Sequence, residues 1–522
     1  MNIGSEMQEI SSNNKRIAKN TLLLYFRMLV TMAVSLYTSR VVLNILGVED
    51  FGIYNVVGGI VAMFGFINGS MTSATQRYLT FELGQNNRTQ LTKVFSTSLS
   101  IHAIISFLII VLAETVGLWF LWNKMQIPAD RMNAAFWVFQ CSVAASVIMI
   151  MSVPYNAAII AHEKMSAFAY ISIIEVSLKL LIVCFLRYFH TDKLILYAAL
   201  IVIVQLVIRL CYSWYCNRHF KETKYRWIWD KTLFCEMTGF AGWNLFGNLA
   251  AITFTQGLNL LLNMFFGPVV NAARGIAVQA QTAIGQFSSN FQTALNPQIT
   301  KSYATGDMEY MHGLIFRSAK FSFFLLLLLS LPVLIETKAL LTLWLKIVPD
   351  HTVVFLRIML CTTWVYAVSN PLITAASATG KIKLYQSVVG GLLLLILPIS
   401  YLCLRLGLPA YSVFIVHLVI EITAQFARLL MLKRMIKLSL REYFSKVVWC
   451  IFKVTAIALA VPQAVIYCHP QHGVWNLLMV CLVCTLSTSI SIYYFGLTSG
   501  EKTFISSKIS VILARLKPKT KD

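Results

Sequence analysis

Apolar stretches of about 20 residues recur along the whole chain and are separated by short polar segments. Each is long enough to cross a bilayer core of ~30 Å as a helix, and none shows the ~10-residue alternation of a membrane β-barrel. The pattern therefore predicts an all-α polytopic membrane protein with about 14 transmembrane helices. The predicted spans are residues 20–46, 52–81, 94–122, 133–160, 165–187, 194–216, 237–265, 270–299, 314–336, 352–378, 384–403, 410–432, 447–467 and 475–496.

The stretch from Arg40 to Gly84 departs most from the pattern of a lipid-facing helix. It contains an acidic turn and then a span rich in Gly, Asn, Ser and Thr that ends in Gln76 and Arg77. Small residues allow helices to approach closely, whereas polar residues at this depth face other helices or a water-filled cavity. The glycines fit either explanation. Gln76 and Arg77 favour a cavity, because they are costly unless paired or hydrated.

An internal repeat organises the first twelve spans. Residues 154–168 align without gaps with residues 371–385, at an offset of 217 positions, and a similar polar span returns near residue 260. Six spans return the chain to the same side, so the repeats are parallel and related by an axis along the membrane normal, with a cleft and a rocking motion between them. Further matches are Arg209-Leu210 with Arg428-Leu429 (offset 219), Leu46-Gly47 with Phe266-Gly267 (220) and Gly84 with Gly306 (222).

The repeat sets the predicted domain organisation. Spans thirteen and fourteen fall outside it, and we expect them to pack outside the two lobes. The segments are a basic cytoplasmic N-terminus (1–19), an N-lobe of spans one to six (20–216), a basic cytoplasmic linker (217–236), a C-lobe of spans seven to twelve (237–432), spans thirteen and fourteen with the preceding basic loop (433–496), and a basic cytoplasmic tail (497–522).

Composition supports the membrane class. The chain of 522 residues is 58% hydrophobic and only 12% charged, whereas a soluble domain is roughly 25% charged. The net charge of +22 does not indicate nucleic-acid binding, because the basic residues lie mostly in short loops between spans. Their distribution follows the positive-inside rule and predicts that both termini are cytoplasmic. The eleven cysteines are scattered, so no metal site is expected.

Charges within the spans indicate a path for an anion. Ten basic and only two acidic residues fall there, and the guanidinium fork of Arg matches phosphate oxygens. Glu175 can pair with Lys179 on its own helix, and Glu421 can neutralise Arg428. The arginines without a local acid are Arg27, Arg40 and Arg274, and we predict that they line the cavity and bind a diphosphate; an interfacial anchoring role is the alternative.

A stripe of amides on span seven offers a second class of contact. Asn244, Asn248 and Asn259 fall largely along one helical face, where they suit either sugar hydroxyls or hydrogen bonds between helices. With Gln76 and Arg77 they form a weaker candidate set for binding sugars. The chain shows no DxD, HExxH, P-loop or GxSxG motif, so no catalytic residue and no enzymatic activity are predicted.

The chain resembles the Wzx-type polysaccharide-repeat flippases of the multidrug/oligosaccharidyl-lipid/polysaccharide (MOP) exporter superfamily. The resemblance rests on NILGVEDFGIYNVVGGI followed by SATQRYLTFELGQ, on the two lobes and on the two extra C-terminal spans. It implies a transporter that moves an undecaprenyl-diphosphate-linked oligosaccharide across the bacterial inner membrane for O-antigen or capsule synthesis, with a polysaccharide polymerase as a potential partner. No cofactor is implied, and no coupling ion is specified.

Two other functions compete with this prediction. An ion-coupled multidrug or small-molecule exporter of the same superfamily usually stops at twelve spans and relies on buried carboxylates, whereas this chain has about fourteen spans and few acids. A membrane-embedded glycan polymerase or transferase would bring a large outer loop or catalytic acids, and the chain shows neither.

Overall fold

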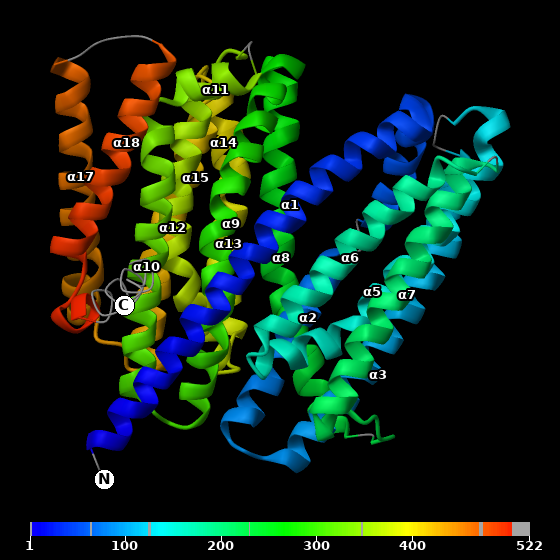
Figure 1. Cartoon of the computed structure of the whole chain (residues 1–522), viewed down its shortest axis with the longest axis horizontal. Coiled ribbons are helices and arrows are strands. Elements are labelled where there is room, and N and C mark those ends of the chain that lie inside the picture. Colours follow the sequence, from blue (N-terminus) through cyan, green and yellow to red (C-terminus); the bar gives the residue numbers. More distant parts are fainter. Residues whose placement is uncertain are drawn as a thin grey trace, which may run out of the picture. The chain divides into compact units, whose positions relative to one another are not determined.

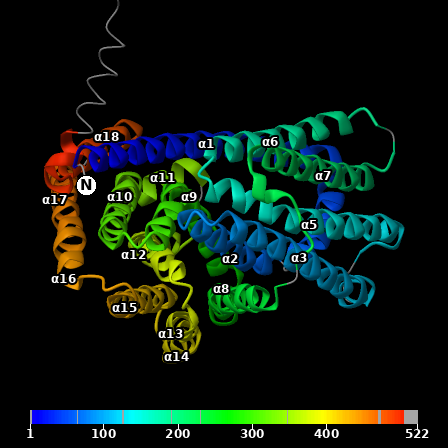
Figure 2. The same cartoon turned by 90° about the horizontal axis from the view of Figure 1, so that it is seen from below.

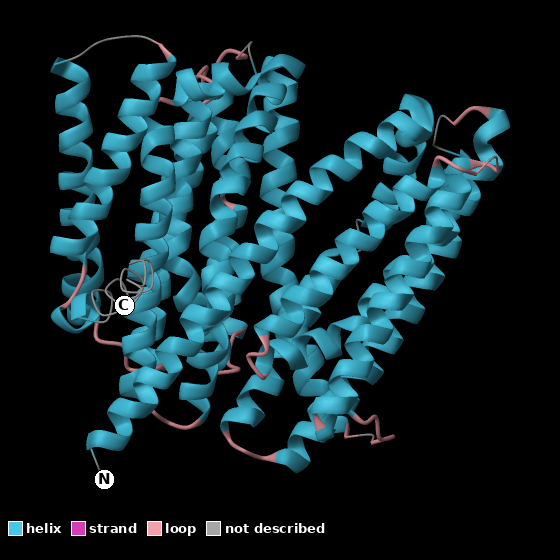
Figure 3. Ribbon diagram, viewed as in Figure 1, coloured by secondary structure: helices cyan, strands magenta, loops and turns pink. Residues whose placement is uncertain are grey.

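The computed structural model describes residues 3–503 of the chain, apart from residues 63–64, 124–126, 190, 229, 346–347 and 469–472. Within these ranges the chain is helical or forms short connections, and no strand occurs (Figure 3). A bilayer favours this outcome, because a helix satisfies its backbone hydrogen bonds within one segment. The all-α polytopic class predicted from the sequence is confirmed.

Eighteen α-helices and five shorter helical segments are found in the described ranges, and Figure 1 labels many of the helices. In the first half they are α1 (Ile3–Ala62), α2 (Gly65–Gly84), α3 (Arg88–Leu112), η1 (Ala113–Gly117), α4 (Leu118–Asn123), η2 (Ala129–Arg131), α5 (Met132–Ala161), α6 (Met165–Leu186), α7 (Lys193–His219), η3 (Lys221–Thr223) and α8 (Lys231–Phe266). In the second half they are α9 (Pro268–Ala304), α10 (Met308–Ile335), α11 (Thr337–Leu345), α12 (Thr352–Ala378), α13 (Lys383–Leu394), α14 (Ile396–Arg405), α15 (Ser412–Met435), α16 (Leu440–Tyr443), η4 (Phe444–Val448), α17 (Trp449–Cys468), α18 (Val474–Ser491) and η5 (Ile492–Gly496).

Twelve helical segments of the described chain are long and apolar enough to cross a membrane, two fewer than predicted. The predicted spans that are not among these twelve are the second (52–81) and the eighth (270–299), which the repeat pairs with each other. The described residues of both stretches are nevertheless helical, in α1 with α2 and in α9. The second stretch includes residues 63–64, which lie outside the described ranges, and the eighth is rich in Gln, Asn, Ser and Thr. The chain is a multi-pass membrane protein.

The described chain packs as two units. Unit 1 comprises Met1–Thr253, Thr293–Met311 and Thr374–Gly391, and unit 2 comprises Phe254–Gln292, His312–Ile373 and Leu392–Asp522. Unit 1 thus contains the whole predicted N-lobe together with end segments of several helices from the predicted C-lobe. Contacts between the two repeats therefore occur inside unit 1.

Unit 1 has an extended apolar core. Buried residues of α2, α3, α5, α6 and α7, including Phe95, Ile159 and Val183, form one cluster with the start of α8. Helix α1 runs beside α6, and α5 runs beside α7 (Figures 1 and 2). At Gly47, α1 breaks with φ of +80°, which is the turn the sequence predicted after the first span. Arg131 anchors this turn, because its Nε donates to Asp50 Oδ1 at 2.8 Å.

Unit 2 places the last two spans against α10. Helices α17 and α18 pack side by side (Figure 1). Val454 of α17 and Val480 of α18 join Phe324 and Leu327 of α10 in one buried cluster. The last spans therefore contribute to the core of unit 2 through one face of α10. Their exclusion from a central cleft stays a prediction.

The backbone records the internal repeat at its turns. Gly47 and Gly267, 220 positions apart, have φ of +80° and +77°, and Glu163 and Gly380, 217 apart, have φ of +58° and +75°. These offsets are the ones predicted. At the turn after the second span the predicted pairing of Gly84 with Gly306 is wrong, because the left-handed residue that corresponds to Gly306 (φ +78°) is Asn86 (φ +57°). The correct offset there is 220.

Candidate functional site

Arg27 lies on α1 against α6. Its Cζ is 4.4 Å from the centroid of the Phe168 ring, and Glu175 of α6 adds an attractive charge. The side chain is half-buried, and its Nε has no hydrogen-bond partner. The Arg27 guanidinium therefore packs on the face of an aromatic ring, and the protein supplies no hydrogen-bond acceptor for its Nε. The side chain of Arg40 lies outside the described residues.

Arg274 is a buried cation held by uncharged oxygens. It lies on α9 and is only 9% exposed. Its Nη1 donates to Asn259 Oδ1 at 3.2 Å and its Nη2 donates to the Thr255 carbonyl at 2.8 Å, both on α8. Arg274 is thus hydrogen-bonded to Asn259, one of the amides of the predicted stripe. Neither oxygen neutralises the guanidinium, and a buried charge in such a setting favours an anion nearby.

The amides of α8 bond to neighbouring helices. Asn244 is buried and accepts from Gln386 Nε2 at 3.0 Å, and Asn248 donates to Ser70 Oγ at 2.9 Å. Hydrogen bonds between helices were one of the two roles predicted for this stripe. Binding of sugars by Asn244, Asn248 and Asn259 stays a prediction.

Arg77 joins the two repeats within unit 1. Gln76 is half-buried on α2, and the neighbouring Arg77 donates from Nη2 to the Ala378 carbonyl at the end of α12, at 3.0 Å. The guanidinium also lies 4.5 Å from the Tyr78 ring centroid. A Cβ built on Gly380 would be 2.7 Å from Arg77 Nη2, so only glycine leaves room for this contact without displacement of the arginine.

Replacing Gly380 by alanine should destabilise unit 1. A left-handed backbone costs an L residue about 1–2 kcal/mol, and the new methyl group would also displace Arg77. Gly391→Ala is the matched control, since a Cβ there meets nothing within 4 Å and alanine favours the helix. Thermal unfolding in detergent should show a lower midpoint for Gly380→Ala alone. Equal midpoints for the two variants would contradict the close packing of Arg77 on this turn.

The predicted site residues fall in both units. Arg27, Gln76, Arg77, Asn244 and Asn248 belong to unit 1, and Arg274 with Asn259 belongs to unit 2. The structure brings Arg274 together with Asn259, and it gives Arg27, Arg77, Asn244 and Asn248 partners within unit 1. Convergence of the arginines on one cavity stays a prediction.

Both carboxylates predicted within the spans are paired. Glu175 Oε1 lies 2.6 Å from Lys179 Nζ, and Glu421 Oε1 lies 2.8 Å from Arg428 Nη1. These are the two local pairs the sequence predicted. Each carboxylate therefore has its charge balanced by a basic side chain.

A cluster around Glu163 was missed by the sequence analysis. The Glu163 side chain is 1% exposed and lies 2.8 Å from Arg16 Nε and 2.6 Å from Lys301 Nζ. It also accepts from Gln298 Nε2 at 2.6 Å. We call Arg16, Glu163, Gln298 and Lys301 the Glu163 clasp. It ties α1 and the α5–α6 turn of the first repeat to the end of α9 in the second.

The turn that contains Glu163 is fixed by its neighbour. His162 Nε2 contacts Glu222 Oε1, and the His162 ring stacks on Phe220 with centroids 4.0 Å apart. Burial acts to raise the pKa of Glu222, but the hydrogen bonds and charges around it, led by the hydrogen bond to His162, together hold the pKa below its ordinary value. The sequence contains one signal for this cluster. Glu163 occupies the position that corresponds to Gly380 in the second repeat, although a non-glycine residue is unfavourable in a left-handed turn.

The fold of this chain is similar to solved structures of MOP-superfamily transporters. No protein-family model matches the chain, and no curated protein matches its sequence. A multidrug resistance MATE family transporter of the MOP superfamily, in an outward-facing conformation, superposes with a TM-score of 0.70 at 12% identity, over 81% of this chain and 96% of that one.

Two further structures agree. A MATE transporter of Vibrio cholerae in a bent form gives a TM-score of 0.66 at 17% identity, over 82% of this chain and 98% of that one. A MOP superfamily transporter of Pyrococcus furiosus, described as having a binding pocket of reverse polarity, gives 0.68 at 14% identity, over 81% and 96% of the two chains. At these identities the similarity defines the fold, and the fold of this chain is that of the MOP-superfamily transporters.

Proposed function

We propose that the protein is a transporter that moves an anionic, lipid-linked substrate across the membrane, namely an undecaprenyl-diphosphate-linked oligosaccharide at the bacterial inner membrane, with both termini cytoplasmic. The observation that carries this proposal is Arg274, a buried guanidinium bonded to neutral oxygens. A diphosphate would supply the missing negative charge. Arg27 offers a second guanidinium, whose Nε has no hydrogen-bond acceptor in the protein. The MOP fold supports transport rather than catalysis.

The charges of the spans favour an anion over a cation. An exporter of cationic drugs needs carboxylates that can release one partner and accept another. Here Glu175 and Glu421 are each bound to a basic side chain, and Glu421 is buried with its partner. The resemblance of the sequence to Wzx-type flippases points in the same direction.

Arg274→Ala should lower the rate of substrate translocation at least tenfold. A hydrogen bond to a charged group is worth about 1.5–3 kcal/mol, and each 1.4 kcal/mol is a factor of ten. Arg274→Lys should retain part of the activity, because it keeps the charge and loses the fork. Proteoliposomes containing labelled lipid-linked oligosaccharide measure this rate.

The control for that assay is Lys453→Ala, which removes an exposed cation stacked on Trp449. It should translocate normally, and all variants should unfold at midpoints close to that of the unchanged protein. Normal translocation by Arg274→Ala would overturn the proposed role of Arg274.

Export of small molecules is a second candidate function. The multidrug resistance transporter with the same fold favours it directly. The test is uptake of a fluorescent cationic dye by proteoliposomes under an imposed proton or sodium gradient. Gradient-driven dye transport without translocation of the lipid-linked oligosaccharide would establish this candidate instead of the first.

A further inference from the structure

A cavity of about 390 Å³ lies in unit 1. Three parts of the chain line it: the end of α2 with the start of α3, the α5–α6 turn, and the end of α7 with η3. The stack of His162 on Phe220 and the contact of His162 with Glu222 fix one of its walls. The volume falls in the range of about 300–1,000 Å³ that is typical of ligand pockets.

Three cations line this cavity, and they come from three different parts of the chain. Arg88 begins α3, Lys164 lies in the α5–α6 turn, and Lys221 begins η3. Their side chains are exposed, and none of them forms an ion pair with another residue that the structure describes. A cleft lined by charges of one sign concentrates ions of the opposite sign, so this cavity attracts anions.

The two carboxylates of the lining are engaged by other groups. Glu222 Oε1 contacts His162 Nε2, and the charge of Arg88 also attracts Glu222. The charge of Arg77, which lies outside the lining, attracts Glu82. An anion that enters the cavity therefore meets the three cations without first breaking an ion pair.

The second repeat has a different residue in place of one of these cations. Asn87 and Asp307, 220 positions apart, each cap the helix that follows them, so Arg88 corresponds to Met308. Because the equivalent turn forms with methionine, the turn itself does not require a cation at position 88. Lys164 has a counterpart in Lys381, which lies outside the lining of the cavity.

The cavity lies at an edge of the membrane-spanning helices. Two candidate spans begin beside it, Arg88–Asn123 and Met165–Leu186, and two end beside it, Met132–Ala161 and Lys193–His219. In the predicted topology this edge is cytoplasmic. Exposed aromatic side chains, which are typical of the interface between headgroups and hydrocarbon, lie close along the chain to these helix ends: Tyr170, Trp214, Tyr225 and Trp227.

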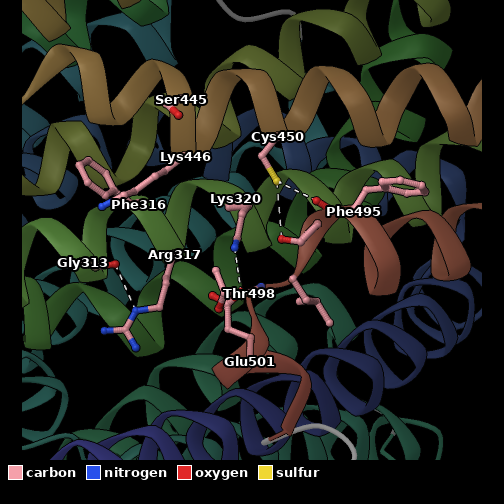
Figure 4. Close-up of a pocket in the computed structure, with 12 residues that line it drawn as sticks. Gly313, Phe316, Arg317, Lys320, Ser445, Lys446, Cys450, Phe495, Thr498 and Glu501 are labelled. Atoms are coloured by element: carbon pink, nitrogen blue, oxygen red, sulfur yellow. Dashed lines mark hydrogen bonds and ion pairs between the residues drawn. The ribbon is translucent and has the colours of Figure 1, made fainter.

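A second cavity, of about 460 Å³ in unit 2, is a weaker candidate for binding an anion (Figure 4). Its Lys320 Nζ lies 2.8 Å from Glu501 Oε2, and this pair is largely buried. Lys446 Nζ lies 2.6 Å from a carboxylate oxygen of Glu442. An anion in the unit 2 cavity would therefore compete with carboxylates that are already bound to its lysines, whereas the cations of the unit 1 cavity have no such competitor within ion-pair distance among the described residues.

We propose that the cavity of unit 1 binds the phosphodiester headgroup of an anionic phospholipid through Arg88, Lys164 and Lys221. Basic pockets between transmembrane helices on the cytoplasmic side bind such headgroups. The guanidinium of Arg88 offers a fork for two phosphate oxygens, and the lysines add point charges. A zwitterionic lipid would gain less, because its own cation meets the same three cations. The proposal holds for either transported substrate considered above.

The test is the amount of phosphatidylglycerol that the purified full-length protein retains from mixed vesicles with phosphatidylcholine, measured by native mass spectrometry. The double variant Lys164→Gln with Lys221→Gln should retain at least tenfold less, which corresponds to about 1.4 kcal/mol. The matched control is Lys381→Gln with Lys383→Gln. It removes two exposed cations at the equivalent turn of the second repeat, outside the lining, and should retain the normal amount.

Two single variants extend the test. Arg88→Met introduces the residue of the second repeat and should lower retention, whereas Glu82→Gln removes a carboxylate from the lining and should raise it. Unfolding midpoints close to that of the unchanged protein verify that each variant is folded. Equal loss in the control, normal retention by Arg88→Met, equal retention of phosphatidylcholine, or displacement of the lipid by inorganic phosphate at constant ionic strength would each overturn the proposal. The last result would identify a site for free anions.

Discussion

Glu421→Ala is expected to destabilise the protein severely. Glu421 and Arg428 form an ion pair at 2.8 Å in which both side chains are 5% exposed or less. Arg428 also donates to Ser369 Oγ at 3.1 Å, which connects α15 to α12. Removing the acid leaves a buried cation without its counter-charge, and such a change costs about 3–5 kcal/mol. Thermal unfolding in detergent at a fixed scan rate should show a large fall in the midpoint.

Two comparisons isolate the cause. The double variant Glu421→Met with Arg428→Met removes both charges and keeps the volume, so it should recover most of the loss. Glu442→Ala removes an exposed ion pair with Lys446 and should leave the midpoint unchanged. If the double variant is no more stable than Glu421→Ala, the loss comes from packing or from the bond to Ser369, and the electrostatic explanation is wrong.

Much of the fold could be predicted because it depends on local patterns. The length of each apolar stretch predicted where the spans lie. The pairs Glu175–Lys179 and Glu421–Arg428 were predicted because their spacing places both residues on one face of a helix. The repeat could be recognised because turns with positive φ, such as those at Gly47 and Gly267, favour glycine at equivalent positions. The eighth span is helical but falls below the apolar criterion, because it is rich in Gln, Asn, Ser and Thr.

The site was less predictable because it depends on long-range contacts. The clasp joins Glu163 to Lys301 across 138 positions, and no periodicity relates the two. The sequence analysis did not pair Arg274 with Asn259, whereas in the structure the guanidinium of Arg274 donates to the amide oxygen of Asn259. Periodicity gives the face of a helix that a residue occupies, but the partner on another helix depends on how the helices pack.

Breaking the Glu163 clasp should separate the ends of the two repeats. Glu163→Gln removes the charge that holds Arg16 and Lys301. Hydrogen bonds to charged groups are worth about 1.5–3 kcal/mol each, so loss of one such bond shifts a two-state population at least tenfold. We expect a second, longer distance between Thr89 and Glu309, which are exposed, equivalent positions of the two repeats within unit 1.

Electron paramagnetic resonance between spin labels introduced as unnatural amino acids at these two positions measures the distance, since the chain has eleven cysteines. Comparing Glu163→Gln with Glu163→Gly separates charge from backbone strain. Both variants remove the negative charge, but only glycine adopts a φ of +58° without strain. Glu163→Gly should give the longer distance as Glu163→Gln does. Glu222→Gln removes the carboxylate charge next to His162 and leaves the clasp intact, so it should keep the original distance. An unchanged distribution in both Glu163 variants would show that other contacts, such as Gln85 with Ala304, hold these ends together.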